Sequence, residues 1–214
     1  MNSQTQRLVM AGPVGDIELL VDEPLDVPLR AARGVAVIAH PHPLFGGTMD
    51  NKVVQTLARA CVLSGWRAVR FNFRGVGASA GAHDAGKGEL QDLLAVVAAH
   101  AASGPLVLAG FSFGAFVTSH AVAALHPVHT LEHIVLVGTA ATRFEVAPIA
   151  PELHGRTLVI HGETDDTVPL ADVMNWARPQ SLPVTVVPGV GHFFHGQLPL
   201  LRGLLVRHLA QSIS

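Results

Sequence analysis

Along the chain, short apolar runs typical of β-strands alternate with longer segments whose apolar residues recur at helical spacing. Two runs near the start, residues 8–10 and 17–21, are joined through glycine and proline, which predicts an antiparallel hairpin. Further strands are predicted at residues 35–39, 67–71, 106–109, 134–137, 157–160 and 184–187, and helices at residues 51–63, 88–101, 113–125, 168–176 and 193–209.

This alternation predicts an α/β protein with a doubly wound, mostly parallel sheet and helices on both faces. The chain has 214 residues, which suits a single domain spanning residues 1–214. Hydrophobic residues make up 49% and charged residues only 14%, as expected when strands are buried on both faces. Ligands bind such sheets at the carboxyl ends of the strands, so functional side chains are expected just after strands.

Charge and cysteine content argue against several classes of partner and site. The formal net charge is −2, from 14 basic and 16 acidic residues without a basic run, so no nucleic acid or anionic membrane partner is predicted. The single cysteine, Cys61, allows neither an intramolecular disulfide nor a cysteine cluster for a metal. The sequence has no secretory signal pattern and no stretch of ~18–20 apolar residues, so we expect a cytoplasmic location.

The first chemical motif, Gly110-Phe111-Ser112-Phe113-Gly114, lies between a predicted strand and a predicted helix. A nucleophilic serine in this context stands on a sharp strand-to-helix turn, where only glycines two residues away tolerate the close approach of other backbone. The pattern therefore favours Ser112 as a nucleophile. The alternative is a serine that only caps the helix after it.

Two adjacent acidic residues, Asp165 and Asp166, follow the strand predicted at residues 157–160. From this position a carboxylate can reach a histidine, fix its tautomer and stabilise the imidazolium formed during reaction. An acid here can instead shape a turn or cap the helix before Pro169, and Asp166 suits that role.

A candidate base, His192, lies in a glycine-flanked loop after the strand predicted at residues 184–187. A neutral imidazole with a pKa near ~6.5 is well suited to accept a serine proton near neutral pH. His195 is a competitor, but it falls inside the helix predicted at residues 193–209. The remaining histidine cluster, His126, His129 and His133, is expected on a solvated surface.

The loop after residues 35–39 is a candidate source of an oxyanion-binding N–H. The Phe113 N–H, directly after the nucleophile, is expected to be one donor, and this early loop should supply the other. Its two prolines have no N–H, which leaves His42, slightly favoured, or Leu44. His40 and His42 could instead form a metal-binding pair, but spacing marks no third ligand, so no metal is predicted.

Ser112, Asp165 and His192 occur in the chain order of an α/β-hydrolase catalytic triad. From about Val35 onward, the chain also resembles small lidless bacterial α/β-hydrolases related to dienelactone hydrolases. The segments that carry this resemblance are HPHPLFGGTMDNK at residues 40–52, FNFRGVGAS at 71–79, HGETDDTVP at 161–169 and GHFF at 191–194. The resemblance implies the α/β-hydrolase fold and this triad, and it selects Asp165 over Asp166. Dienelactone hydrolases carry cysteine at the position of Ser112, so their substrate is not implied.

These features predict a serine hydrolase that cleaves small acyl substrates, short-chain carboxylic esters or thioesters, through an acyl-enzyme and without a cofactor. Acyl transfer, peptide or amide hydrolysis on the same triad, and a non-catalytic binding role stay open, as does the oligomeric state. A lid is commonly inserted after the strand at residues 134–137, but Pro148 and Pro151 leave room there for one short helix at most. We therefore expect no lid domain and an open, shallow crevice lined by Leu44, Phe45 and Phe113.

Overall fold

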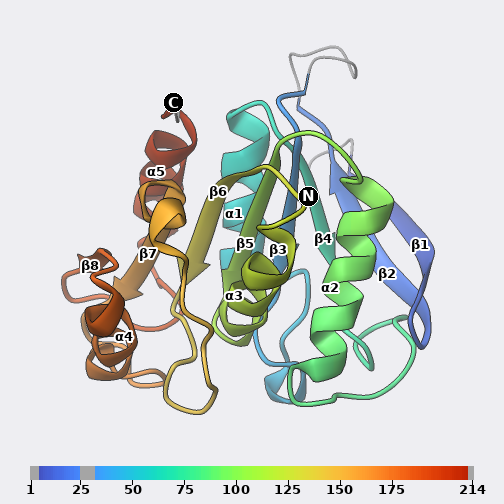
Figure 1. Ribbon diagram of the computed structural model, residues 1–214. Helices are drawn as coiled ribbons and strands as arrows, with labels where there is room; N and C mark the ends of the chain where they lie inside the picture. The colour runs from blue at the N-terminus through green and yellow to red at the C-terminus, as the bar shows by residue number, and fades with distance from the viewer. Residues whose placement is uncertain (1–4, 25–31, 212–214) are drawn as a thin grey trace.

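The computed structural model describes residues 5–24 and 32–211, in which eight strands form one sheet (Figure 1). The strand order is β1-β2-β4-β3-β5-β6-β7-β8. β1 and β2 form an antiparallel hairpin, β2 is antiparallel to β4, and the neighbouring pairs from β4 to β8 are parallel. The strands are β1 (Gln6–Gly12), β2 (Gly15–Asp22), β3 (Val35–Ala39), β4 (Arg67–Phe71), β5 (Leu106–Phe111), β6 (Leu131–Val137), β7 (Thr157–Gly162) and β8 (Val184–Val187).

Helices cover both faces of this sheet, so the predicted doubly wound, mostly parallel architecture is confirmed. α1 (Lys52–Leu63) and α5 (Leu198–Leu209) pack on one face, and α2 (Lys87–His100), α3 (Phe113–Leu125) and α4 (Leu170–Ala177) pack on the other (Figure 1). In β5, Leu106 and Leu108 belong to the core beneath α2–α4, whereas Val107 and Ala109 belong to the core beneath α1 and α5. Burial on both faces explains why the central strands β3 and β5 are continuous apolar runs.

The last helix begins later than the sequence pattern predicts. α5 starts at Leu198, and residues 193–197 belong to a loop in which Phe194 and Gly196 have positive φ angles. Pro199 lies in the first turn of α5, where its missing N–H leaves no helical hydrogen bond unmade. The prediction that His195 lies inside this helix is therefore wrong, because the backbone turns at Phe194 and Gly196 before the helix can begin.

The connection between β6 and β7 contains only a short 3₁₀ helix, η2 (Pro151–Arg156). This agrees with the prediction of at most one short helix, and no lid domain is inserted between residues 32 and 211. The carboxyl ends of β5, β7 and β8 are consequently not covered by an additional layer of helices.

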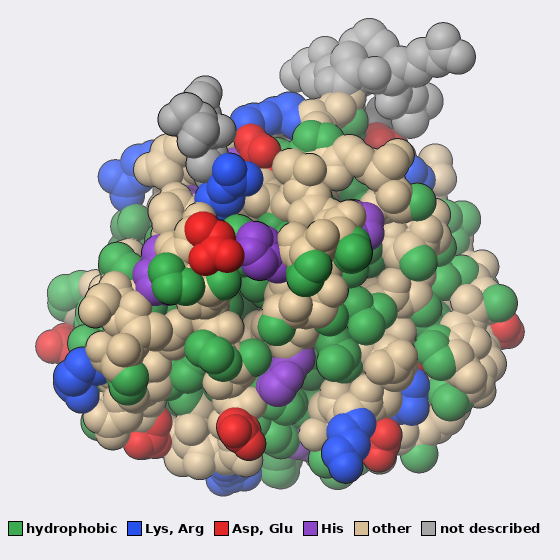
Figure 2. All heavy atoms as spheres, in the orientation of Figure 1, with side chains coloured by type: hydrophobic (Ala, Val, Ile, Leu, Met, Phe, Trp, Pro, Cys, Tyr) green, Lys and Arg blue, Asp and Glu red, His purple; other side chains and the backbone are tan. Residues whose placement is uncertain are grey.

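The face covered by α2, α3 and α4 carries acidic and basic side chains interspersed with apolar ones (Figure 2). No patch of a single charge sign dominates this view. None of the described helices is long and apolar enough to cross a membrane.

His133 lies in the core rather than on the solvated surface that the sequence predicts. It belongs to β6, is 0% exposed, and stands edge-on to the rings of Trp66 and His208 at centroid distances of 6.0 and 4.9 Å. Neither of its ring nitrogens has a hydrogen-bond partner among the described residues. Burial, followed by the nearby positive groups of His208, Arg33 and Arg156, lowers the pKa of His133 to about 4.

We predict that His133 makes the fold sensitive to mild acid. The folded protein keeps this imidazole neutral until the pH approaches 4, whereas the unfolded chain protonates it near its ordinary pKa of 6.5. The free energy of unfolding should therefore fall as the pH drops from 6.5 to 4, by on the order of 3 kcal/mol.

His40, whose pKa burial also lowers to about 4, contributes in the same pH window, so the comparison needs a variant at position 133. Urea unfolding of wild type and His133→Phe across this range should show a shallower pH dependence in the variant. Parallel curves for the two proteins would contradict the assignment.

Candidate active site

The turn between β5 and α3 places Ser112 in a backbone conformation that non-glycine residues rarely adopt. Its φ is 57° and its ψ is −117°, and its N–H donates to the Val137 carbonyl oxygen at 2.8 Å. A Cβ on Gly110 would approach the carbonyl oxygen of Gly114 to 2.4 Å, so the turn cannot close with a larger residue there. Ser112 makes no side-chain capping hydrogen bond to α3, which removes the capping role considered from the sequence.

His192 lies in the loop after β8 and reaches Ser112 from the side of β6. Its Nε2 is 3.0 Å from the Ser112 Oγ, and its side chain is almost completely buried. The imidazole packs against the Phe111 ring at 4.9 Å and against the Phe193 ring at 5.1 Å. These contacts leave the ring little freedom to rotate away from Ser112.

Asp165 lies in the turn after β7 and uses both carboxylate oxygens. Oδ1 accepts the Thr167 N–H at 3.0 Å and the Val168 N–H at 2.7 Å, while Oδ2 is 2.7 Å from the His192 Nδ1. Because an ionised carboxylate only accepts hydrogen bonds, Nδ1 carries the proton in this contact. Nε2 of the neutral imidazole is then free to accept the Ser112 hydroxyl proton.

The environment of Asp165 keeps its carboxyl group ionised. Burial raises the pKa, but the hydrogen bonds from His192 and the Val168 N–H, together with the imidazoles of His192 and His161, lower it by more. The net shift of the Asp165 pKa is downward. An anion at Oδ2 is what stabilises a protonated His192 electrostatically.

The sequence left open that Asp166 caps α4, and the structure shows that it does not. The N-cap of α4 is Pro169, with no side-chain capping bond, and the turn before it is held by Asp165. The exposed carboxylate of Asp166 makes only a long 3.4 Å contact with the Thr167 hydroxyl, and it borders a cavity beside Ser112. Asp165 thus combines the turn-forming contacts with the contact to His192.

A residue without a role in the sequence argument, His161, also contacts this turn. His161 is completely buried in β7, and its Nε2 lies 2.9 Å from the Val168 carbonyl oxygen and 3.4 Å from the Asp165 Oδ2. Burial lowers the pKa of His161, so the imidazole is neutral and donates from Nε2 to the carbonyl. His161 and Gly162 are part of the motif that precedes Asp165 in the sequence, but no spacing or neighbouring residue predicts that His161 contacts this turn.

The competing histidines lie elsewhere. His195 follows Phe194 in the loop before α5, with its ring 5.9 Å from that of Phe193, whereas His192 holds the contact with Ser112. His126 pairs with Glu152 on the surface at 2.9 Å.

His42 and Phe113, the two residues expected to supply oxyanion-binding N–H groups, line the same cavity as Ser112. The Phe113 N–H opens α3, and neither it nor the His42 N–H has an acceptor among the described residues. The Leu44 N–H, in contrast, donates to the His42 Nδ1 at 3.2 Å. A Cβ on Gly114 would lie 2.4 Å from the Ala39 carbonyl oxygen, so this glycine lets the β3 loop approach the serine turn closely. The geometry favours His42 over Leu44 as the second donor.

His40 is a structural histidine of the same loop. It is completely buried, its Nδ1 is 2.6 Å from the Pro41 carbonyl oxygen, and its Nε2 accepts the Phe73 N–H at 3.0 Å. Both ring nitrogens therefore have backbone partners. Within residues 5–24 and 32–211, no three His, Cys, Asp or Glu side chains are grouped to hold a metal ion.

A cavity of about 360 Å³ opens beside Ser112. Its wall includes three aromatic rings, and part of it comes from the β6–β7 connection, which sequence reasoning did not assign to the site. Leu44, expected in the lining, is instead 69% exposed and absent from it, because the short 3₁₀ helix η1 (Pro43–Phe45) directs this side chain outward. The lining residues are His42, Phe45, Ser112, Phe113, Ala140, Thr142, Arg143, Phe144, Asp166, Thr167 and Val168.

Three known proteins are similar to this chain in sequence, and two of them have solved structures with the same fold. A solved α/β serine hydrolase without a lid from Xanthomonas campestris is 38% identical, with a TM-score of 0.84 over 98% of this chain and 95% of that one. An α/β serine hydrolase homologue from Coxiella burnetii is also 38% identical, with a TM-score of 0.79 over 96% and 97%. An uncharacterized protein of Rickettsia prowazekii is 31% identical over 183 residues, 75% of this chain and 71% of that protein. No protein-family model matches the chain.

The strained backbone at Ser112 leads to a stability prediction. Both Ser112→Gly and Ser112→Ala remove the hydroxyl, but only glycine relaxes at a φ of 57°. The strain of such a residue costs about 1–3 kcal/mol, which exceeds the roughly 0.4–1 kcal/mol by which glycine usually stabilises the unfolded chain. Urea unfolding should therefore find Ser112→Gly more stable than Ser112→Ala by about 1 kcal/mol. The opposite order would mean that the turn is not strained.

Proposed function

The chain belongs to the α/β serine hydrolases, and from this premise we propose that it hydrolyses short-chain carboxylic esters or thioesters through an acyl-enzyme. The observation that carries the proposal is the continuous line of contacts from the Asp165 Oδ2 through His192 to the Ser112 Oγ, at 2.7 and 3.0 Å. This line ends beside a cavity whose wall combines phenylalanine rings with polar side chains. Such an arrangement activates a serine hydroxyl that is otherwise a weak nucleophile.

In the proposed acylation step, the Ser112 Oγ attacks the carbonyl carbon of the substrate as the His192 Nε2 takes its proton. The carbonyl oxygen becomes an oxyanion between the N–H groups of Phe113 and His42. The C–O or C–S bond to the leaving group then breaks, and the leaving group takes the proton from His192. Water repeats the sequence on the acyl-serine, which releases the carboxylic acid and restores the hydroxyl.

Electrostatic preorganisation explains why these contacts accelerate the reaction. The Asp165 carboxylate favours the Nδ1–H tautomer of His192 and stabilises the imidazolium that forms. A single oxyanion-binding donor is worth about 10²–10³ in kcat in a serine hydrolase. Two N–H groups fixed by backbone geometry require no reorganisation when the charge develops.

The cavity supports a small acyl group as substrate. Phe45, Phe113 and Phe144 supply apolar wall beside Ser112, and the Phe113 and Phe144 rings stand edge-on at 5.2 Å. Phe45 is 74% exposed, so the wall gives way to solvent within a short distance. An acyl chain that extends past these rings gains no further burial.

The two adjacent acids should differ sharply in effect. In Asp165→Asn, the new amide can donate to the His192 Nδ1. This contact favours the tautomer that carries its proton on Nε2, and Nε2 then cannot accept the Ser112 proton. We expect kcat to fall by on the order of 10⁴. The matched control Asp166→Asn should change kcat by no more than about twofold, because its carboxylate is exposed and makes one long contact. Equal losses in steady-state assays of both variants would sink the assignment of Asp165.

Nitrophenyl esters of increasing acyl length test the substrate proposal. From acetyl to butyryl, kcat/KM should rise by at most about fourfold per methylene, the equivalent of ~0.8 kcal/mol per buried CH₂, and then level off or fall. No increase is expected when the substrate forms micelles, since the described chain has no lid to open. Ser112→Ala should hydrolyse none of these esters above background. A kcat/KM that continues to rise into long chains would contradict the proposed preference.

A further inference from the structure

The triad leaves one motif without a role: the segment Phe71-Asn72-Phe73-Arg74-Gly75-Val76-Gly77, at the end of β4. This segment lies beside the loop of residues 40–51, which carries the His42 N–H. A loop donor is useful in catalysis only if its position is fixed to well under an ångström. The contacts of this loop therefore indicate what the motif does.

The first anchor of the loop is His40, whose ring joins the two segments. Its Nδ1 donates to the Pro41 carbonyl oxygen and its Nε2 accepts the Phe73 N–H. This contact holds the chain directly before His42.

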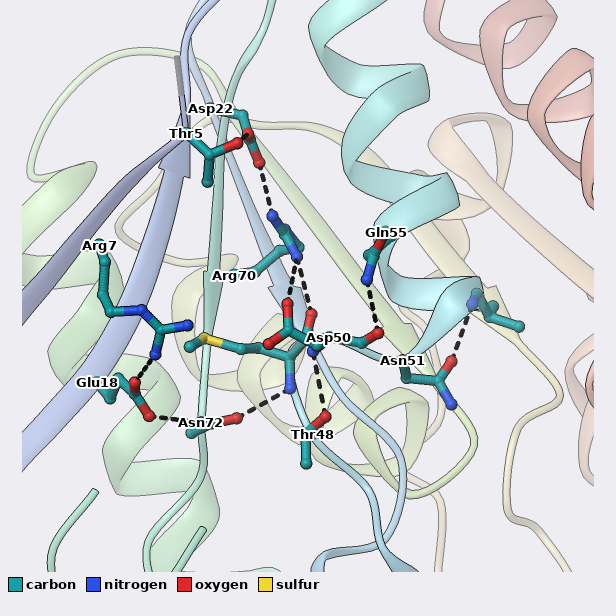
Figure 3. A network of polar contacts seen from close by, with 12 residues as sticks. Thr5, Arg7, Glu18, Asp22, Thr48, Asp50, Asn51, Gln55, Arg70 and Asn72 are labelled. Carbon is teal, nitrogen blue, oxygen red and sulfur yellow. Dashed lines mark hydrogen bonds and ion pairs between the residues drawn. The ribbon is translucent and has the colours of Figure 1, made fainter. Parts of the chain in front are cut away.

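The second anchor is Met49, on the far side of His42. Its N–H donates to the Asn72 Oδ1 at 2.9 Å, and its carbonyl oxygen accepts from the Arg70 guanidinium at 3.0 Å (Figure 3). Met49, Arg70 and Asn72 are all nearly completely buried. Both backbone groups of Met49 are thus held by side chains from β4 and the residue after it.

This anchor is transmitted to His42 through Gly47. The Gly47 N–H donates to the His42 carbonyl oxygen at 3.0 Å, and Gly47 is two residues from Met49. A Cβ on Gly47 would lie 2.0 Å from the Pro41 carbonyl oxygen, so the loop is closed tightly at this point. A shift of Met49 would therefore displace the peptide units on both sides of His42.

Glu18 of β2 fixes which way the Asn72 amide points. Its Oε2 accepts the Asn72 Nδ2–H at 2.8 Å, and its Oε1 contacts Arg7 (Figure 3). Oε2 also accepts the Ala78 N–H at 3.0 Å. Burial raises the pKa of Glu18, but the bonds from Ala78 and Asn72 and the charge of Arg7 lower it by more. A carboxylate cannot donate, so Nδ2 must face Glu18 and Oδ1 must face the Met49 N–H.

Gly77 leaves the space that this arrangement requires. With a φ of 57°, a Cβ at this position would lie 2.5 Å from both the Asn72 Nδ2 and the Glu18 Oε2. The motif therefore supplies the amide, the room for its partner and the Phe73 N–H that holds His40.

We propose that Asn72, oriented by Glu18, is a positioning residue that holds the His42 N–H in place for the oxyanion. This inference rests on the proposed function, because it gives the His42 N–H a task only in acyl transfer. Asn72 is not among the residues that line the cavity, and its side-chain hydrogen bonds go to Met49 and Glu18 and not to the triad. Its contribution should consequently appear in the stabilisation of the tetrahedral state and not in substrate binding or in the titration of His192.

The test compares Asn72→Leu, Glu18→Leu and Glu18→Gln with wild type. Asn72→Leu keeps the approximate shape but removes the acceptor of the Met49 N–H, and Glu18→Leu lets the amide turn its donor toward that N–H. For both we expect kcat to fall by about 10–100-fold, since a displacement near 1 Å costs about 10². KM and the pH midpoint of kcat/KM should stay unchanged. Glu18→Gln retains an acceptor for the amide and should recover most of the rate.

Affinity for a trifluoromethyl ketone, which adds to the serine and presents an oxyanion, should fall by the same factor as kcat/KM. Leu205→Ala in α5 is the control for lost stability, because Leu205 is completely buried in the core beneath α1 and α5 but belongs neither to the triad nor to the cavity lining. Assays well below the unfolding temperature should find its kcat close to that of wild type. Arg7→Met removes only the contact between Arg7 and the Glu18 Oε1, and its kcat should also stay close to that of wild type.

The outcomes separate this inference from the proposed function. Wild type that neither binds the ketone nor hydrolyses an ester overturns both. Normal wild-type activity combined with undiminished kcat and ketone affinity in Asn72→Leu overturns the positioning role alone. The same holds if Asn72→Leu changes KM or the pH midpoint, or if Leu205→Ala loses as much kcat.

Discussion

The backbone of Ser112, with φ at 57° and ψ at −117°, forms a sharp corner between β5 and α3 around which the site is built. The corner places the Ser112 hydroxyl 3.0 Å from the His192 Nε2, and the first N–H of α3 follows it directly in the chain. It also demands glycine at 110 and 114, and the second of these lets the β3 loop approach. A single strained residue thereby determines where the base, the acid and the second N–H have to lie.

Burial of two carboxylates is tolerated around this corner because Asp165 and Glu18 each accept more than one hydrogen bond. Asp165 gives one oxygen to the turn before α4 and the other to His192. Beside the loop that carries His42, the Asn72 amide likewise uses both ends: its oxygen accepts the Met49 N–H and its nitrogen donates to Glu18. An unpaired buried carboxylate would be strongly destabilising, whereas a fully bonded one fixes geometry. The hydrogen bonds from the sheet therefore fix the geometry of the site, and no lid domain among the described residues covers the cavity beside Ser112.

Local patterns sufficed for central strands such as β3 and β5, which are buried on both faces and apolar along their length. They also sufficed for α3, whose predicted limits agree with the structure. They also placed Ser112, Asp165 and His192 after strand ends, where the structure brings them into contact. The predicted start of α5 was too early, because the positive φ angles at Phe194 and Gly196 keep these residues out of the helix. Other features depend on contacts between segments that are distant in the sequence. They are the two sets of hydrogen bonds of Asp165, the place of Phe144 in the cavity wall and the hydrogen bonds that hold Met49. No spacing within one segment encodes such contacts.

The claim that Ser112 carries the acyl group can be tested by pre-steady-state hydrolysis of nitrophenyl acetate with rapid acid quench. A burst of nitrophenolate close to one equivalent per active site is the kinetic sign of an accumulating acyl-enzyme when deacylation is slow. Intact-mass measurement should then show one added acetyl group, and peptide mapping should place it on Ser112. Asp165→Asn should slow this burst, and Ser112→Ala should abolish it. Acetyl found on another residue, or turnover retained in Ser112→Ala, would contradict the account.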